Sequence, residues 1–403
     1  MKLKPSKMLA ALFVAACALR GDAGGPVRPG IEVLLTDSLH LVRGRRVGIL
    51  TNQTGVNRAG TSDVDLLARS GIQLTAIFTP EHGFRGDLDR ENIGNTVDSA
   101  TGVPIHSLFG AVRAPTKEML ARIDLLLVDL QDIGARPYTY ISTTLLAMRA
   151  ARESDRPVVV LDRPNPIGGE LVQGPVLEEA DSSFVGMLPV PLRHGMTLGE
   201  LARLGNAFLK IGAQLTVVPV TGWRRSQWFD ETGLPWVRPS PNMPTLESAV
   251  HYPGMVLFEA TNLSVGRGTP KAFQVLGAPW LHPRAVKDAL GAVAGVEISD
   301  TTIVPQSPSD GKYPGQKLPA LRLRVRNRAA YDPTRLAVRL LAVIEALHRD
   351  SLRIQGKALD QRAGTAGLRL GLERGASADS IWSGWKTALD RFLRERRDFL
   401  LYK

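Results

Sequence analysis

The chain has 403 residues, of which 44% are hydrophobic and 22% charged, and its formal net charge is +11. This composition excludes an intrinsically disordered protein, and the length allows two or three domains. The positive charge suits an anionic ligand or surface, but the arginines are spread along the chain without a zinc-finger spacing or another nucleic-acid signature. We therefore expect no nucleic-acid partner.

The N-terminus has the features of an export signal. Lysines precede an apolar run at residues 8–19, which is too short to span a bilayer as a mature helix. Cys17, the only cysteine of the chain, ends a Val-Ala-Ala-Cys stretch that resembles a bacterial lipobox. We expect an exported protein, either periplasmic or attached to a membrane through a lipidated Cys17. Cleavage within Ala16–Ala18 is the alternative to lipidation.

Strands and helices alternate through the first half of the chain. Apolar runs predict strands, and capping residues before amphipathic runs predict helices. The predicted strands are 46–51, 72–78, 104–109, 123–130, 157–161 and 215–220, and the predicted helices are 62–69, 115–122, 141–153 and 197–211. The run at 123–130 is apolar almost throughout, as expected of a strand that is buried on both faces. This alternation predicts an α/β, Rossmann-like three-layer domain with a mostly parallel sheet.

The pattern changes after a proline-rich segment at residues 235–253, which shows no clear periodicity. In residues 321–326, leucine or valine alternates with arginine, which is typical of a half-exposed strand in an antiparallel sheet. Helices are predicted at 333–349 and 378–399. We therefore predict three segments, which are a leader and flexible linker at 1–29, the Rossmann-like domain at 30–248 and a smaller α+β domain at 249–403.

Several strands of the first domain are followed directly by polar loops. Parallel strands bring the loops at their carboxyl ends to one edge of the sheet, where ligands bind in open α/β folds. The polar side chains in these loops are Asn52, Glu81, His82, Arg85, Asp132, Arg136, Tyr138, Tyr140, Arg163 and Asn165. Asparagine and aspartate are also ordinary turn formers, but several such loops at one edge favour a site. The polar segment at 87–102 is a candidate lid or binding loop.

Most familiar catalytic signatures are missing. The sequence has no G-x-S-x-G elbow, no H-E-x-x-H metal motif and no Walker A, and no G-x-G-x-x-G follows the first strand. We therefore expect neither a metal ion nor a cofactor. What remains is carboxylate chemistry, which suits a glycosidase or a sugar-binding module. A glycosidase typically needs one carboxyl group to protonate the leaving oxygen and a second group to activate water or attack the sugar.

Six sequence runs carry a family resemblance. They are GILTNQTGV, IFTPEHGFRG, DLQDIGARPYTYISTT, LDRPNPIGG, PSPNMPT and FEATNLSVGRGT, in this order. Together they resemble the NamZ family of exo-β-N-acetylmuramidases, and the resemblance covers essentially the whole mature chain. It implies release of a terminal, non-reducing N-acetylmuramic acid from peptidoglycan-derived saccharides. It also implies a cleft between a Rossmann-like domain and a smaller C-terminal domain.

The resemblance suggests which groups act in catalysis. Glu81 is the expected general acid/base, and the further candidates are Glu259, Asp132 and Tyr138. The identity of the second group and the stereochemical outcome stay open. A non-catalytic lipoprotein that binds muropeptides is the alternative function.

The chemistry of muramic acid suggests the binding residues. Its lactyl carboxylate requires a fixed cation, which Arg163, Arg136 or Arg267 would provide as a forked donor. The other expected substrate-binding residues are Asn52, His82, Arg85, Tyr140, Asn165 and Asn242. Tryptophans at 223, 228 and 236 suit either a sugar-stacking wall or ordinary packing.

Overall fold

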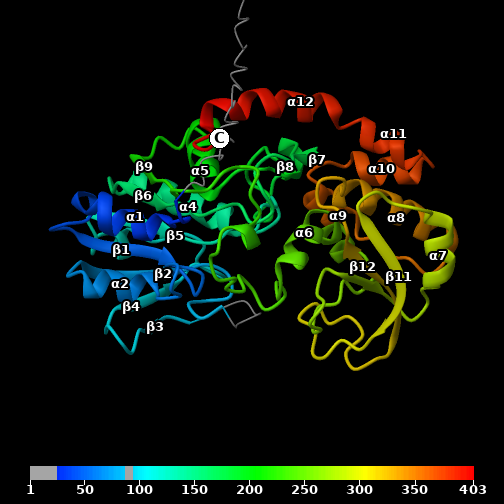
Figure 1. The fold of residues 1–403 in the computed structure, drawn as a ribbon, viewed down its shortest axis with the longest axis horizontal. Helices are drawn as coiled ribbons and strands as arrows, with labels where there is room; N and C mark the ends of the chain where they lie inside the picture. Colours follow the sequence, from blue (N-terminus) through cyan, green and yellow to red (C-terminus); the bar gives the residue numbers. More distant parts are fainter. Residues whose placement is uncertain (1–24, 87–93) are drawn as a thin grey trace, which may run out of the picture.

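The computed structural model describes residues 25–86 and 94–403, and its two parts lie side by side (Figure 1). The first part is built on a seven-stranded sheet with the strand order β3-β4-β2-β1-β5-β6-β9. Its strands are β1 (Arg46–Thr51), β2 (Gln73–Thr79), β3 (Thr96–Val97), β4 (Pro104–Ser107), β5 (Leu125–Asp129), β6 (Val158–Leu161) and β9 (Leu215–Val218). Every neighbouring pair is parallel except the short β3 with β4. The predicted α/β class with a mostly parallel sheet is confirmed.

Alternate residues of the central strands enter two separate hydrophobic cores, because successive side chains of a strand point to opposite faces. In β5, Leu125 and Leu127 belong to the core formed with α1 (Gly30–Asp37) and α2 (Asp63–Arg69). Leu126 and Val128 belong to the larger core formed with α3 (Lys117–Leu120), α4 (Tyr140–Glu153) and α5 (Leu198–Phe208). The sheet therefore lies between two helical layers, as the sequence predicts.

The second part contains a three-stranded antiparallel sheet with the order β10-β12-β11. Its strands are β10 (Val275–Gly277), β11 (Val296–Ile303) and β12 (Leu318–Val325), and its helices are α6 (Leu246–Met255), α7 (Pro283–Leu290), α8 (Pro333–His348), α9 (Gly356–Ala363), α10 (Gly367–Glu373), α11 (Ala378–Ser383) and α12 (Lys386–Glu395). This is the smaller α+β unit that the sequence predicts. Within the described ranges, no helix combines the length and apolar character that a membrane span requires.

Shorter elements connect these units. A two-stranded sheet pairs β7 (Gln173–Val176) with β8 (Pro191–Arg193). The 3-10 helices are Leu39–Leu41, Glu179–Asp181, Phe229–Glu231, Val256–Ala260 and Arg396–Phe399. The sequence does not predict the β7–β8 pair, because these strands are short and carry no regular alternation.

Helix α6 lies in the proline-rich segment, where the sequence predicts no regular element. Pro253 stands inside this helix, although a proline ordinarily removes one helical hydrogen bond. Burial offsets that loss, since every residue from Ser248 to Met255 is buried. A Cβ atom at Gly254 would lie 1.9 Å from the backbone oxygen of Pro333, so α6 packs closely on the start of α8. The boundary predicted after residue 248 falls within α6, and this helix joins the two parts.

Two details of the second part differ from expectation. The helix predicted at 378–399 is interrupted after α11, where the buried ring of Trp385 joins the core before α12 begins. The alternation at 321–326 places Arg322 on an exposed face, but Arg322 is buried. Its Nη1 donates to the backbone oxygen of Gln274 at 3.1 Å, so the guanidinium group has an internal partner.

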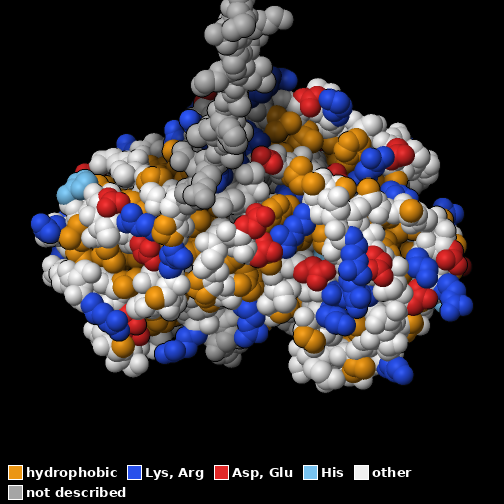
Figure 2. Space-filling view, viewed as in Figure 1, with side chains coloured by type: hydrophobic (Ala, Val, Ile, Leu, Met, Phe, Trp, Pro, Cys, Tyr) orange, Lys and Arg blue, Asp and Glu red, His pale blue; other side chains and the backbone are white. Residues whose placement is uncertain are grey.

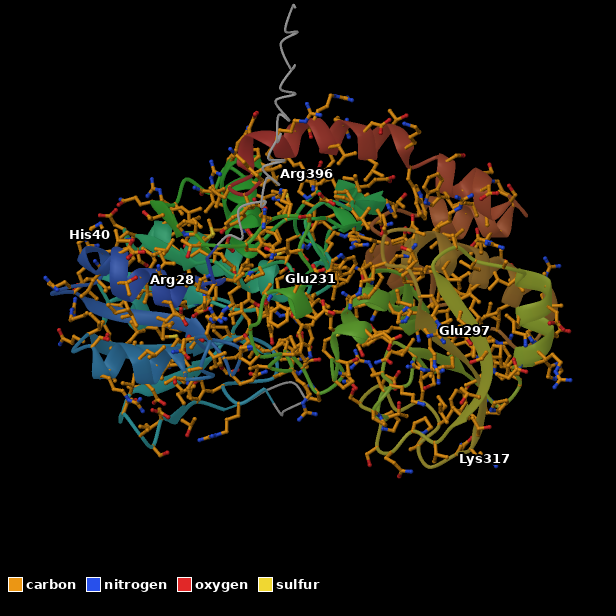
Figure 3. All side chains as sticks on the ribbon, in the orientation of Figure 1. Arg28, His40, Glu231, Glu297, Lys317 and Arg396 are labelled. Carbon is orange, nitrogen blue, oxygen red and sulfur yellow. The ribbon has the colours of Figure 1, made fainter. Side chains whose placement is uncertain are left out.

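The C-terminal segment returns to the first part after α12, which crosses over both parts (Figure 1). Arg396 donates to backbone oxygens at the end of the sheet domain, among them that of Gly195 at 3.1 Å (Figure 3). Tyr402 packs edge-on against Trp223, with 5.1 Å between ring centroids, and its hydroxyl donates to Asp162. The C-terminus therefore connects the second part to the loop that follows β6.

The described end of the predicted linker is packed and ordered against the same region. Val27 is buried beside Val220 and Trp223. The backbone N–H of Gly30 donates to the backbone oxygen of Asp162 at 2.8 Å. Residues 27–29, which the sequence assigns to a flexible linker, therefore form part of the domain.

Asp162 predicts a pH dependence of stability. Burial raises the pKa of this carboxyl group from 3.8 to about 6, against hydrogen bonds from Tyr402, Thr197 and Gly199 that lower it. A raised pKa in the folded state means that protonation favours folding, so this contribution is complete below about pH 4 and is lost as the pH rises through 6. The shift corresponds to about 3 kcal/mol at most. In urea unfolding between pH 4 and 7, Asp162→Asn should remove this part of the wild-type pH dependence, and an unchanged profile would contradict the assignment.

The clearest cluster of basic side chains in Figure 2 lies over β12, where acidic side chains accompany it. It surrounds a pocket of about 340 Å³ that is lined by arginines of residues 322–328 and by Glu247. Arg326 is paired with Glu297, and Arg328 with Asp230 at 2.7 Å. Much of the charge in this cluster is therefore balanced by neighbouring carboxylates.

Candidate active site

The polar loops at the carboxyl ends of the parallel strands meet at one edge of the sheet. β1 pairs with β2 on one side and β5 on the other. The strands before β5 are added on one side of β1 and the later strands on the other side, so the strand order reverses at β1. Ligands of open α/β sheets bind outside this switch point. The Gln131 backbone N–H donates to the Thr54 hydroxyl at 3.0 Å, and the Gln131 side chain donates to the Pro164 backbone oxygen at 2.9 Å. These bonds tie the loops after β1, β5 and β6 into one surface.

Asn52 and Tyr140 form the next layer of this surface. The Asn52 amide donates to the Tyr140 hydroxyl at 2.7 Å, and that hydroxyl donates to the Pro239 backbone oxygen at 2.5 Å. Both side chains are buried, so they fix the loops more than they expose groups to a ligand. Beside them is a pocket of about 410 Å³, whose lining includes Gln53 and Arg85.

Glu81 lies at the same edge, directly after β2 and Pro80. His82 and Gly83 follow with φ angles of 73° and 75°, and this left-handed pair turns the chain sharply back. The Thr139 hydroxyl donates to Glu81 Oε2 at 2.6 Å. No hydrogen bond or ion pair with another described residue is found for Oε1, and the side chain is only half-buried. Among the described contacts, Glu81 therefore has one oxygen fixed by a hydrogen bond and one that is not.

A row of aromatic rings runs from Glu81 toward the second part. Tyr138 lies 4.7 Å from Tyr140 and 6.0 Å from Tyr252 between ring centroids, and Tyr252 lies 4.7 Å from Phe273. No hydrogen bond to another described residue is found for the buried Tyr138 hydroxyl, although the neighbouring Tyr140 hydroxyl is close enough to influence its pKa. Burial raises the pKa of Tyr138 well above its usual value, so this hydroxyl stays a proton donor at neutral pH.

Glu259 lies at the far end of this row, in the 3-10 helix Val256–Ala260. Arg267 contacts Glu259 Oε1 through both Nε, at 2.7 Å, and Nη2, at 2.5 Å, while Arg362 lies 3.7 Å from Oε2. The Arg267 guanidinium is 5.5 Å from the Phe273 ring centroid. Burial raises the pKa of Tyr252, and the charges of Glu259 and then Glu81 add to this effect. Both carboxylates therefore act electrostatically on Tyr252, which lies in the helix that joins the two parts.

Asp132 and Asn165 are more deeply enclosed than the other candidates. Asp132 Oδ2 accepts the Gly134 N–H at 2.6 Å and lies 3.5 Å from His194 Nε2, whereas the buried Oδ1 has no hydrogen-bond partner within residues 25–86 and 94–403. Asn165 donates to the Met196 backbone oxygen at 2.9 Å. These contacts give both residues a role in shaping the loops.

All three arginines proposed for the lactyl carboxylate have internal partners, and two of them are also buried. Arg136 is buried and donates to the backbone oxygens of Pro175, Val190 and Arg362. Burial lowers the pKa of Arg136 to about 9. Arg163 is buried against Asp129, the last residue of β5. Arg267 is the candidate that the structure places at the junction, beside Glu259.

The remaining candidates occupy different surroundings. His82 and Asn242 are buried, whereas Arg85 is exposed at the edge of the 410 Å³ pocket. Cys17 lies outside the described residues, as does part of the 87–102 segment. The tryptophans pack internally, with Trp223 on Tyr402, Trp228 between two arginines and Trp236 on Phe229.

Sequence reasoning does not single out three residues of the candidate site. Thr139 holds Glu81, and Tyr252 and Phe273 continue the aromatic row across the junction. Thr139 stands within the quoted DLQDIGARPYTYISTT run, but its pairing with Glu81 depends on two neighbouring loops. Tyr252 lies in α6, which the sequence does not predict. Among the described residues, no group of three or more histidines, cysteines or acids is arranged to hold a metal ion.

Two consecutive models of one glycoside hydrolase family match this chain. Residues 47–247 match the N-terminal model and residues 250–402 the C-terminal model of the exo-β-N-acetylmuramidase NamZ. Together the models cover most of the chain. The chain belongs to the NamZ family of exo-β-N-acetylmuramidases, and it is a glycoside hydrolase.

Individual relatives agree with this membership. The peptidoglycan β-N-acetylmuramidase NamZ of Bacillus subtilis (strain 168) is 41% identical over 381 residues, which is 93% of this chain and 91% of the relative. Two crystal structures of DUF1343 family proteins from Bacteroides fragilis NCTC 9343 share the fold, with TM-scores of 0.87 and 0.74. Each is 32% identical, and each match covers 94% of this chain and 99% of the other.

Proposed function

We propose that this enzyme releases N-acetylmuramic acid from the non-reducing end of peptidoglycan fragments, with Glu81 as the general acid/base. The observation that carries the proposal is the setting of Glu81. It lies at the carboxyl edge of the sheet. One carboxylate oxygen accepts a hydrogen bond from Thr139, and no hydrogen bond or ion pair to another described residue is found for the other. The named activity of the B. subtilis relative, together with 41% identity over 93% of the chain, supports the substrate class.

The proposed reaction uses the Glu81 carboxyl group as a proton source. Its proton goes to the glycosidic oxygen as the bond from that oxygen to C1 breaks, and water then supplies the hydroxyl on C1 and the proton that restores the carboxyl group. A threonine hydroxyl orients the group without adding a charge, so both protonation states are compatible with the contact. Glu259 is less suited to this step, because protonating it would disturb its contacts with Arg267 and Arg362.

The junction also offers groups for binding the sugar. The buried rings of Tyr138, Tyr252 and Phe273 pack edge to face and form an apolar wall at the junction. Arg267 is the proposed partner of the lactyl carboxylate, since it lies beside this wall, whereas Arg136 and Arg163 are enclosed. Glu259, Asp132 and Tyr138 remain the candidates for the second catalytic group.

Product analysis tests the proposed specificity. The enzyme should release free muramic acid from a disaccharide with N-acetylmuramic acid at its non-reducing end. It should leave the disaccharide of reversed order intact, because the lactyl group would then lie outside the terminal subsite. Mass spectrometry of both digests checks this. Cleavage of both disaccharides would contradict the terminal specificity, and calorimetric binding without release would favour the muropeptide-binding alternative.

We further propose that the enzyme acts outside the cytoplasm, as a periplasmic or membrane-anchored lipoprotein. The basic and apolar leader and the stretch ending in Cys17 support this, as does a substrate derived from the cell wall. Labelled palmitate should be incorporated into the wild-type chain and not into Cys17→Ser. A wild-type chain without label but with a shortened, exported form would indicate cleavage instead.

A further inference from the structure

The loop that joins β11 to β12, residues 304–317, is much longer than an antiparallel pair requires. Common hairpin connections have about two to five residues. This loop packs back on the segment that carries Glu259 and Arg267. The Gln306 N–H donates to the Gly268 backbone oxygen at 2.9 Å, and Arg267 Nη1 donates to the Ser309 hydroxyl at 3.2 Å. The extra residues of the loop therefore allow it to contact the segment that contains Arg267 and Gly268.

Lys312 makes the central contact of this loop. Its Nζ lies 3.0 Å from the backbone oxygen of Leu263, 3.1 Å from that of Glu259 and 3.5 Å from that of Phe258. An ammonium group has three N–H donors, so these acceptors can satisfy it completely. Phe258 and Glu259 belong to the C-terminal end of the 3-10 helix Val256–Ala260, and Leu263 follows it, so the ammonium group meets the end of the helix that attracts a cation. Lys312 therefore caps the C-terminal end of the helix that carries Glu259.

The residues around Lys312 hold it in this place. Asp310 lies 3.6 Å from the ammonium group, and only 15% of the Lys312 side chain is exposed. Tyr313 has a φ angle of 54°, a left-handed conformation that is uncommon for a residue other than glycine. Its hydroxyl donates to the Asn262 backbone oxygen at 2.7 Å. Strained backbone of this kind persists where surrounding contacts determine it, often beside functional sites.

We propose that Lys312 is a positioning residue of the active site. It fixes the 3-10 helix so that the Glu259 carboxylate meets Arg267 beside the Phe273 ring. The lysine itself contacts backbone oxygens of this wall, so its influence on the substrate passes through Glu259 and Arg267. This inference rests on the proposed function, in which these two residues form the second wall of the sugar site.

Steady-state kinetics of Lys312→Met give the first test. Loss of the ammonium group removes this donor from the Glu259 and Leu263 carbonyl oxygens, whereas the Phe258 oxygen keeps the N–H and hydroxyl of Thr261. The helix that carries Glu259 should therefore shift. A misplacement well below 1 Å is expected to lower kcat/KM by about tenfold. Lys317→Met is the matched control, because Lys317 is an exposed lysine at the other end of the same loop (Figure 3). It should keep wild-type kinetics.

A double-mutant cycle separates positioning from a general effect on stability. Binding of N-acetylmuramic acid is measured by calorimetry in the wild type, Lys312→Met, Glu259→Gln and the double variant, all well below their melting temperatures. If Lys312 acts through Glu259, its substitution should weaken binding about tenfold in the wild-type background and much less in the Glu259→Gln background. Equal losses in both backgrounds would overturn the proposal, as would wild-type kcat/KM and binding in folded Lys312→Met.

Two further variants keep these outcomes interpretable. Lys312→Gln, which retains a donor without the charge, takes the place of Lys312→Met if the latter does not fold, with the same expected direction. Glu81→Gln is assayed in parallel. If Glu81→Gln still turns over substrate, the proposed function itself is contradicted. If Glu81→Gln loses turnover while the Lys312 variants keep wild-type kinetics, only the positioning role is contradicted.

Discussion

Glu81→Gln should release muramic acid at least about a hundredfold more slowly than the wild type, with an unchanged melting temperature. General acid/base groups contribute about 10²- to 10⁴-fold to a rate, and an amide cannot supply the proton. The amide retains an oxygen that can accept the Thr139 hydrogen bond, so the loop after β2 should keep its conformation. The effect should fall on kcat, because binding of the sugar does not require the proton.

The control for this variant is Glu297→Gln. Glu297 is an exposed glutamate on β11, paired with Arg326 and remote from the junction (Figure 3). Its variant should turn over at the wild-type rate. A substrate whose leaving group is a good phenolate adds a second check, since it needs little protonation and should partly restore the Glu81→Gln rate. Near wild-type turnover of the natural substrate by Glu81→Gln would remove Glu81 from the mechanism.

Tyr138→Phe should separate activity from stability. The Tyr138 hydroxyl is buried near Glu81, and no hydrogen bond to another described residue is found for it. A buried hydroxyl that is not hydrogen-bonded costs about 1–3 kcal/mol. Its removal should leave the free energy of unfolding unchanged or higher. If the same hydroxyl donates to the bound sugar, kcat/KM should fall about tenfold to a hundredfold, because that hydrogen bond is lost in a site with little water.

Urea unfolding and steady-state kinetics on the same preparation check both halves of this expectation. Tyr331→Phe is an informative comparison, because Tyr331 is also buried but its hydroxyl is hydrogen-bonded to His251 at 2.8 Å. That substitution should lower stability and leave turnover intact. Wild-type kcat/KM in Tyr138→Phe would show that the hydroxyl makes no contact with the substrate.

The parallel sheet could be predicted because each of its central strands is a nearly continuous apolar run in the sequence. The run at 123–130 is apolar on both faces, and β5 within it is completely buried between two helical layers. The Thr197–Glu200 capping box marks the start of α5, and both of its hydrogen bonds are present. Helix α6 could not be predicted in this way, since its stability comes from burial and from the close approach of Gly254 to α8 rather than from a local pattern.

In the site, too, some residues have a local sequence signal and others are brought together only by tertiary packing. Glu81 could be singled out because a charged residue directly after a buried strand lies at the edge where ligands bind. Its partner Thr139 and the ring of Tyr252 come from distant segments, so only tertiary packing brings them together. Arg136 looked equally suited to binding a carboxylate, but the sequence does not reveal that three backbone oxygens already occupy its guanidinium group.

A crystal structure of Glu81→Gln with an uncleaved disaccharide, N-acetylmuramic acid at its non-reducing end, tests the central claim most directly. We predict that the side chain at position 81 lies about 2.6–3.2 Å from the glycosidic oxygen. The muramic acid ring should lie against the Tyr138–Tyr252 wall, with its lactyl carboxylate near Arg267. A disaccharide bound with its glycosidic oxygen remote from position 81, and near Asp132 or Glu259 instead, would contradict the account.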